Sequence, residues 1–143
     1  MRNLIATLVL LAVTSTAFAQ VDYKYESIRN RAGTVMSNYK FAPYTDTSQA
    51  VTTRGWSEVG LVLKVRDSAS VTVLYSPSWD GVTFSAVATI DSLSNDTNAG
   101  AVKYFPLPQA ALGFPDVKFS WIVSAFREGK TNDTLDFKVY KRE

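Results

Sequence analysis

The sequence contains neither cysteine nor histidine. Without cysteine it can form no disulfide and no thiolate nucleophile, so its stability has to come from apolar burial and backbone hydrogen bonds. Without histidine, His-based catalytic triads, His-ligated zinc and a histidine proton switch are all excluded. We therefore expect a protein that is not an enzyme and that needs no cofactor.

The sequence also has no excess of charge of one sign. Lys and Arg number 15 against 13 Asp and Glu, and the two signs are interspersed along the chain. A nucleic-acid-binding protein or a membrane-surface protein usually shows a basic cluster. We expect neither of these partners.

Only one long apolar run occurs, and it lies at the N-terminus. Arg2 precedes the aliphatic stretch 4–13, and Ala17-Phe18-Ala19 follows it, a pattern typical of a cleaved secretory signal peptide. The run is shorter than the roughly 20 residues that cross a bilayer. We expect cleavage before Gln20, no membrane span afterwards, and a secreted, periplasmic or extracellular protein.

The remaining 124 residues are enough for one domain. We divide them into an N-terminal arm or first strand, residues 20–45, and a β-sandwich domain, residues 46–143. Period-two alternation of apolar residues dominates and predicts strands. The clearest segments are 57–66, 71–75, 116–126 and 134–140, and 33–41 and 49–53 are weaker.

The connections between these segments carry further expectations. The short link at 67–68 predicts that 57–66 and 71–75 form an antiparallel hairpin. Pro77, Asp80 and Gly81 indicate a turn, with a new strand beginning near Val82 and a long polar loop at 91–100. The proline-rich stretch 106–115 leaves room for a single helical turn around 109–112. About eight strands suit an all-β, two-layer sandwich of jelly-roll or immunoglobulin-like topology.

The motifs that could carry chemistry are weak. Ser37 and Lys40 have the Ser-x-x-Lys spacing of a serine acylase, but they fall in a predicted strand and the companion motifs are missing. The oxygen donors of the loop from Asp91 to Asn98 could hold Ca²⁺, although such residues are equally typical of a solvated loop.

The three tryptophans differ in their sequence surroundings. Trp121 falls in the most apolar strand and is expected in the core. Trp56 follows Gly55 at a strand entry, where packing at the sandwich edge is expected. Trp79 occupies the turn after Pro77, so it either folds back onto the sheet or binds a partner or a sugar. In the second case Asp80 and Tyr75 are its candidate neighbours.

A set of apolar residues alternates with those assigned to the core, and would therefore lie on the outer faces of the sheets. We expect these faces to be covered by residues 21–44 or by another subunit. The candidate assembly face comprises Phe105, Ile122, Phe126 and Tyr140.

Two functions follow from these observations. The first is a secreted, non-catalytic structural or adhesive module that self-assembles or binds another extracellular protein through apolar and aromatic surface. The second is a carbohydrate-binding module that uses Trp79.

Overall fold

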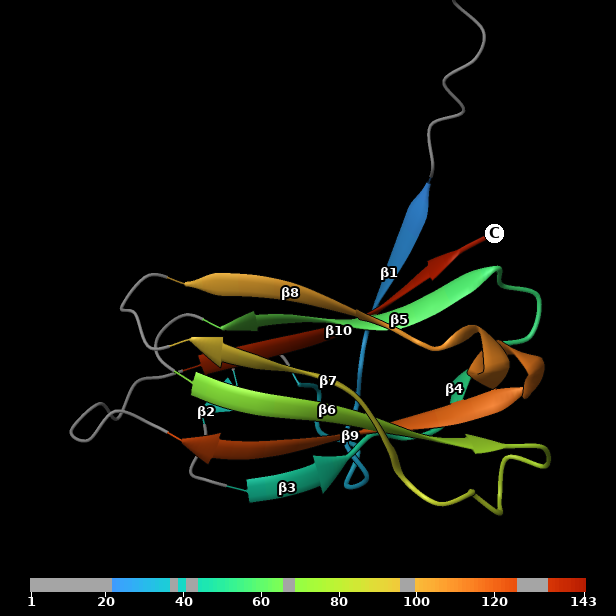
Figure 1. Cartoon of the computed structure of the whole chain (residues 1–143), viewed down its shortest axis with the longest axis horizontal. Coiled ribbons are helices and arrows are strands. Elements are labelled where there is room, and N and C mark those ends of the chain that lie inside the picture. The colour runs from blue at the N-terminus through green and yellow to red at the C-terminus, as the bar shows by residue number, and fades with distance from the viewer. Residues whose placement is uncertain (1–21, 37–38, 41–43, 66–68, 96–99, 126–133) are drawn as a thin grey trace, which may run out of the picture.

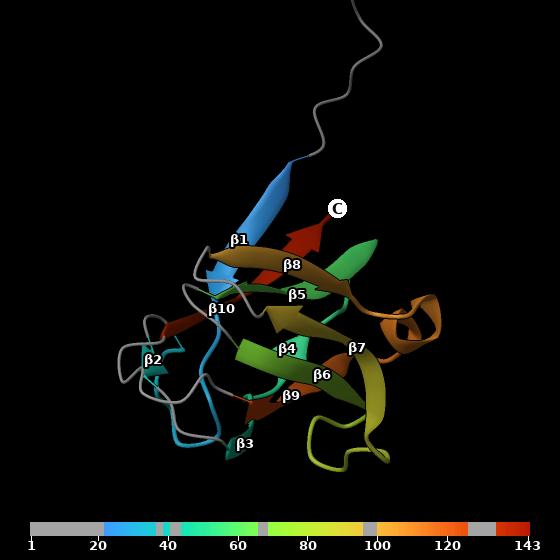
Figure 2. The same ribbon diagram turned by 60° about the vertical axis from the view of Figure 1, so that its left-hand side comes forward.

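The protein is a β-sandwich of two antiparallel sheets, seen in a computed structural model that describes residues 22–36, 39–40, 44–65, 69–95, 100–125 and 134–143 (Figures 1 and 2). The first sheet has the strand order β1 (Tyr23–Ser27), β10 (Thr134–Arg142), β5 (Glu58–Val65) and β8 (Ala101–Pro106), and β2 (Tyr39–Lys40) also pairs with β10. The second sheet has the order β3 (Tyr44–Thr47), β9 (Asp116–Ala125), β6 (Ala69–Ser78) and β7 (Ala88–Asn95), and β4 (Val51–Thr52) also pairs with β9. The predicted all-β sandwich is confirmed.

The core lies between the two sheets and follows the alternation seen in the sequence. Inward side chains of the first sheet are fully or almost fully buried, as are those of the second. Trp121 of β9 and Phe137 of β10 stack across the interface, with ring centroids 4.7 Å apart. The residues that form the two inner faces are Val59, Leu61, Leu63, Val65, Leu135, Phe137 and Val139 on one side and Val71, Val73, Val117, Phe119, Trp121 and Val123 on the other.

The predicted hairpin between β5 and β6 is wrong. β5 pairs with β10 and β8, whereas β6 pairs with β7 and β9, so consecutive strands belong to opposite sheets. Both strands carry a strongly apolar face. In a sandwich these two faces are buried by packing against each other, rather than by lying side by side in one sheet.

The strand predicted to begin near Val82 begins later in the structure, and part of the predicted loop at 91–100 belongs to that strand. Residues 82–87 are outside regular structure, and β7 begins only at Ala88 and continues through Asn95. β7 is an edge strand whose polar residues mostly face solvent, as expected of an edge. Its polar composition therefore resembles a loop although its backbone pairs with β6 from Ala69 to Tyr75.

The proline-rich connection behaves partly as expected. The 3₁₀ helix η1 (Gln109–Gly113) confirms the predicted helical turn.

The turn expected at Pro77 begins later than predicted, because β6 runs through Pro77 to Ser78. Its strand pairing with β7 stops at Tyr75, and at Pro77 the Ser85 amide donates to the Pro77 carbonyl over 2.9 Å, a bond that does not need the missing proline N–H.

Candidate functional site

A hollow with two tryptophans in its lining lies at one end of the sandwich and has a volume of about 370 Å³. We call it the tryptophan pocket. Three segments that are far apart in the sequence form it: the β4–β5 connection, the loop after β6, and the end of η1 with the residues that follow. Its lining consists of Thr53, Arg54, Gly55, Trp56, Trp79, Leu112, Gly113, Phe114 and Pro115.

The β4–β5 connection is a tight turn that presents Arg54 and Trp56. The Trp56 amide donates to the Thr53 carbonyl over 3.2 Å, and Gly55 has φ +82°, as the third position of a type II turn requires. The buried Thr53 holds the turn in place, because its amide donates to the Pro115 carbonyl over 2.9 Å. Its hydroxyl also donates to the Phe114 carbonyl.

The loop after β6 begins with Trp79. The Asp80 carboxylate accepts hydrogen bonds from the amides of Val82 and Thr83 at 2.9 and 2.7 Å. The Thr83 and Val82 amides, with the Ser78 hydroxyl, hold the pKa of Asp80 well below its usual range. Gly81 adopts φ +71° within this turn. The loop is therefore closed by its own hydrogen bonds.

Trp79 remains 72% exposed on this organised loop. Its ring touches only part of the Phe114 ring, with centroids 4.8 Å apart and planes at 48°. Trp56 is half-buried, packs against the core and has the ammonium groups of Lys24 and Lys141 at 5.0 and 5.6 Å from its ring centroid. The pocket thus combines one anchored and one open indole.

Of the three predicted ligand-binding residues, the structure places only Trp79 in this pocket. Asp80 organises the loop backbone rather than lining the pocket. Tyr75 lies within β6 and packs against the core. Trp56 does pack against the core as expected, but its second role in the pocket was missed, because only the folded topology brings the 53–56 turn beside Trp79.

The candidate assembly face does not form one surface. Phe105 is a correction: it pairs with Leu61 in register and is fully buried between the sheets, since antiparallel partners share a face. Ile122 is 38% exposed on β9, in the other sheet from Tyr140. Phe126 lies outside the described residues.

Tyr140 lies instead beneath a group of tyrosines on the outer face of the first sheet. The Tyr23 and Tyr104 rings meet the Tyr140 ring nearly edge-on, at 5.8 and 5.5 Å, and Tyr140 is only 2% exposed. The hydroxyls of Tyr25 and Tyr104 are 3.4 Å apart. We call Tyr23, Tyr25, Tyr104 and Tyr140 the tyrosine face; with Glu58 and Pro106 they line a hollow of about 380 Å³. β1 pairs with β10 and extends the sheet, so it adds Tyr23 and Tyr25 to this face and does not lie across it as a cover.

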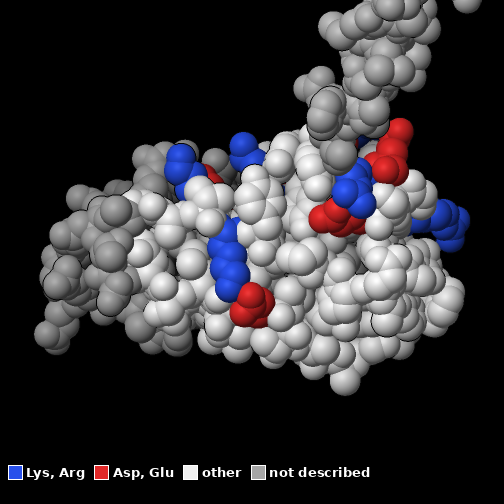
Figure 3. All heavy atoms as spheres, turned by 45° about the horizontal axis from the view of Figure 1, so that its top comes forward, with Lys and Arg blue, Asp and Glu red and all other residues white. Residues whose placement is uncertain are grey.

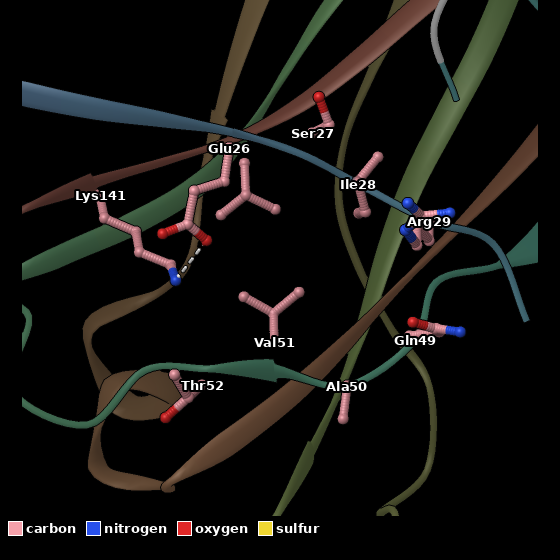
Figure 4. Close-up of a pocket in the computed structure, with 10 residues that line it drawn as sticks. Glu26, Ser27, Ile28, Arg29, Gln49, Ala50, Val51, Thr52 and Lys141 are labelled. Carbon is pink, nitrogen blue, oxygen red and sulfur yellow. Dashed lines mark hydrogen bonds and ion pairs between the residues drawn. The ribbon is translucent and has the colours of Figure 1, made fainter. Parts of the chain in front are cut away.

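A third hollow of about 250 Å³ opens between β1 and β4, at the open side of the sandwich (Figure 4). Lys141 reaches the Glu26 carboxylate there over 2.7 Å, and the Lys141 side chain is almost fully buried while that of Glu26 is half exposed. Apolar side chains of Ile28, Val51 and Val139 form part of its wall. Lys141 and Glu26 thus balance each other, and Arg29, which also lines the hollow, donates to the Gly33 carbonyl over 2.7 Å.

Charged side chains elsewhere are also mixed in sign. Figure 3 shows basic and acidic groups side by side, with broad uncharged areas between them. The pairs include Lys24 with Glu143 at 2.7 Å and Lys103 with Asp91 at 2.6 Å. Asp91 is one of the oxygen donors proposed for Ca²⁺; it lies in β7, whereas residues 96–99 lie outside the described part of the chain. Among the described residues no group of three or more acidic side chains is arranged to hold a metal ion.

No protein-family model and no curated protein matches the chain. Among solved structures the chain is similar to the C-terminal CBM6 of LamC, a marine laminarinase from Zobellia galactanivorans, with a TM-score of 0.40 and 8% identity over 82% of this chain and 90% of that one. Within the described residues, no helix has the length and apolar character needed to cross a membrane.

Proposed function

We propose that the protein is an exported, non-catalytic module that binds carbohydrate in the tryptophan pocket. The observation that supports this proposal is the exposure of Trp79 on a loop held by its own hydrogen bonds, beside Trp56 in the same hollow. A large apolar ring left open to water costs hydrophobic free energy. A ligand with an apolar face, such as a pyranose ring, recovers that free energy when it stacks on the indole.

The geometry suits a sugar better than a drug-like apolar ligand. The hollow is open to solvent, and its wall combines indole and phenyl rings with a guanidinium and a backbone turn. Sugars need both an apolar platform and hydrogen-bonding groups at the rim. The turn at 53–56 and the loop at 78–83 are held by hydrogen bonds before binding. Binding therefore costs little conformational entropy in these segments.

A glycan array with the purified mature domain, followed by calorimetry on any glycan it detects, tests this proposal. Trp79→Ala should weaken binding at least about tenfold, which corresponds to about 1.4 kcal/mol. Val82→Ala is the matched control, because Val82 is 82% exposed on the same loop but does not line the pocket. Glycan binding that survives Trp79→Ala would contradict the proposal, as would the absence of glycan binding by the folded domain.

A second candidate function is the binding of a protein partner or of further copies of the chain. The tyrosine face supports it, because Tyr25 and Tyr104 are each about half exposed beside the exposed Val102. Tyrosine is enriched where protein interfaces form. Mass measured by light scattering over a wide concentration range tests self-assembly, and Tyr104→Asp should abolish any oligomer that forms. A monomer at all concentrations would contradict the self-assembly form of this proposal.

A further inference from the structure

We infer that the tryptophan pocket selects an acidic sugar, one that carries a carboxylate or a sulfate group; this inference rests on the proposed function. Arg54 carries it. Arg54 is the one charged side chain among the described residues that line the pocket. It is exposed at the tip of the 53–56 turn, between the buried Thr53 and the half-buried Trp56.

The guanidinium of Arg54 has no hydrogen bond or ion pair with any other described residue. Other cations near the pocket differ in this respect: Lys24 is paired with Glu143 and Lys141 with Glu26, each at 2.7 Å. Both ammonium groups lie over Trp56, but their charges are largely balanced by these carboxylates. Arg54 therefore contributes the unbalanced positive charge of the pocket.

The guanidinium group also fits the geometry of the inferred ligand. It is planar and offers two parallel N–H donors to a carboxylate or to a sulfate, and it remains charged at every physiological pH. A sugar ring stacked on Trp79 would place its substituents around the ring edge, within the same hollow as Arg54. The pocket lining contains no carboxylate that would repel such a group.

The main test compares three soluble polysaccharides by calorimetry or affinity electrophoresis: polygalacturonate, dextran sulfate and neutral dextran. We expect the domain to bind at least one of the charged polymers, in a salt-sensitive manner, and to bind dextran at least tenfold more weakly. Arg54→Gln should weaken binding of the charged polymer about tenfold or more. Arg54→Lys should recover only part of the loss, because lysine keeps the charge but not the paired donors.

The matched control is Lys138→Gln, which removes the same charge from an exposed position on β10. Equal losses for Lys138→Gln and Arg54→Gln would show a general charge effect and would overturn the inference. If Trp79→Ala abolishes binding while Arg54→Gln does not, and dextran binds as well as the charged polymers, the inference fails and the proposed function stands. If no glycan binds at all, the proposed function fails, and the inference that rests on it fails as well. Which charged polymer binds distinguishes a uronic acid from a sulfated sugar.

Discussion

Asp80 shows how a single side chain can prepare a binding loop. Its carboxylate accepts hydrogen bonds from two backbone amides. These bonds are strongest when the carboxyl group is ionised, and they therefore lower its pKa. The loop-stabilising effect is therefore fully present above about pH 4, where the carboxyl is also ionised in the unfolded chain, and is lost as the pH falls through the lowered value in the folded state.

We expect Asp80→Ala to weaken glycan binding several-fold while changing the global free energy of unfolding little, since Asp80 is exposed. The two quantities are measured by calorimetry and by urea denaturation. A loss of stability that matches the loss of binding would show that Asp80 supports the whole fold rather than the loop.

Trp121 and Trp79 provide a direct contrast in burial. Trp121 is fully buried and stacked on Phe137, so Trp121→Ala should lower the free energy of unfolding by about 3 to 5 kcal/mol. Trp79 is mostly exposed, and Trp79→Ala should stay within about 0.5 kcal/mol. Denaturation midpoints of the two variants compare them directly, and similar midpoints would contradict the assignment of Trp121 to the core.

At the scale of strands, the packing of the first sheet depends on a glycine, which has no side chain. Gly60 of β5 pairs with Tyr140 of β10, and the Tyr140 ring lies over it. A Cβ atom at Gly60 would lie 2.5 Å from Tyr140 Cε1 and 2.6 Å from the Phe105 carbonyl oxygen. Because one of these contacts is with backbone, the strand itself would have to move.

We therefore expect Gly60→Ala to destabilise the domain by about 1 to 3 kcal/mol, the usual cost of overpacking. Gly113→Ala is the control, because a Cβ there meets nothing within 4 Å. Thermal denaturation of both variants checks this. A stable Gly60→Ala variant would mean that the tyrosine face can be rearranged at little cost.

The strands could be predicted from the sequence wherever one face is strongly apolar, as in β5, β9 and β10. Strand pairing could not, because alternation reports which face is buried but not which neighbour lies beside it. The second half of β7, residues 91–95, was predicted to be a loop for a related reason: an edge strand has one ladder and little apolar burial, so its sequence resembles a loop. Phe105 was assigned to the wrong face because its aliphatic and aromatic neighbours Val102 and Tyr104 are also apolar, although they face outward.

The candidate site was accessible to sequence reasoning only in part. Trp79 stood out because a turn gives a large apolar ring no local reason to be buried. Arg54, Trp56 and Phe114 did not, because each has an ordinary sequence setting and gains its place only when three distant segments meet. The tight turn at Gly55 was the one local signal that could have directed attention to Arg54.

For the whole molecule, export remains a prediction, since the first 21 residues lie outside the described part of the chain. We expect cleavage after Ala19, because small residues at positions 17 and 19 fit the signal-peptidase pattern. The intact mass of the exported protein, measured by mass spectrometry, should correspond to a chain that begins at Gln20. A mass that retains residues 4–13 would contradict this prediction.

The three tryptophans lie in three different environments, one buried, one half-buried and one open to water. Indole emission moves to shorter wavelength as water is removed, and an exposed indole is quenched by dissolved acrylamide whereas a buried one is not. The native spectrum should therefore contain a red, quenchable component from Trp79 and a blue, protected one from Trp121. A sugar that covers Trp79 would shift and shield the red component and leave the Trp121 component unchanged, so the domain carries its own optical reporter of an occupied pocket.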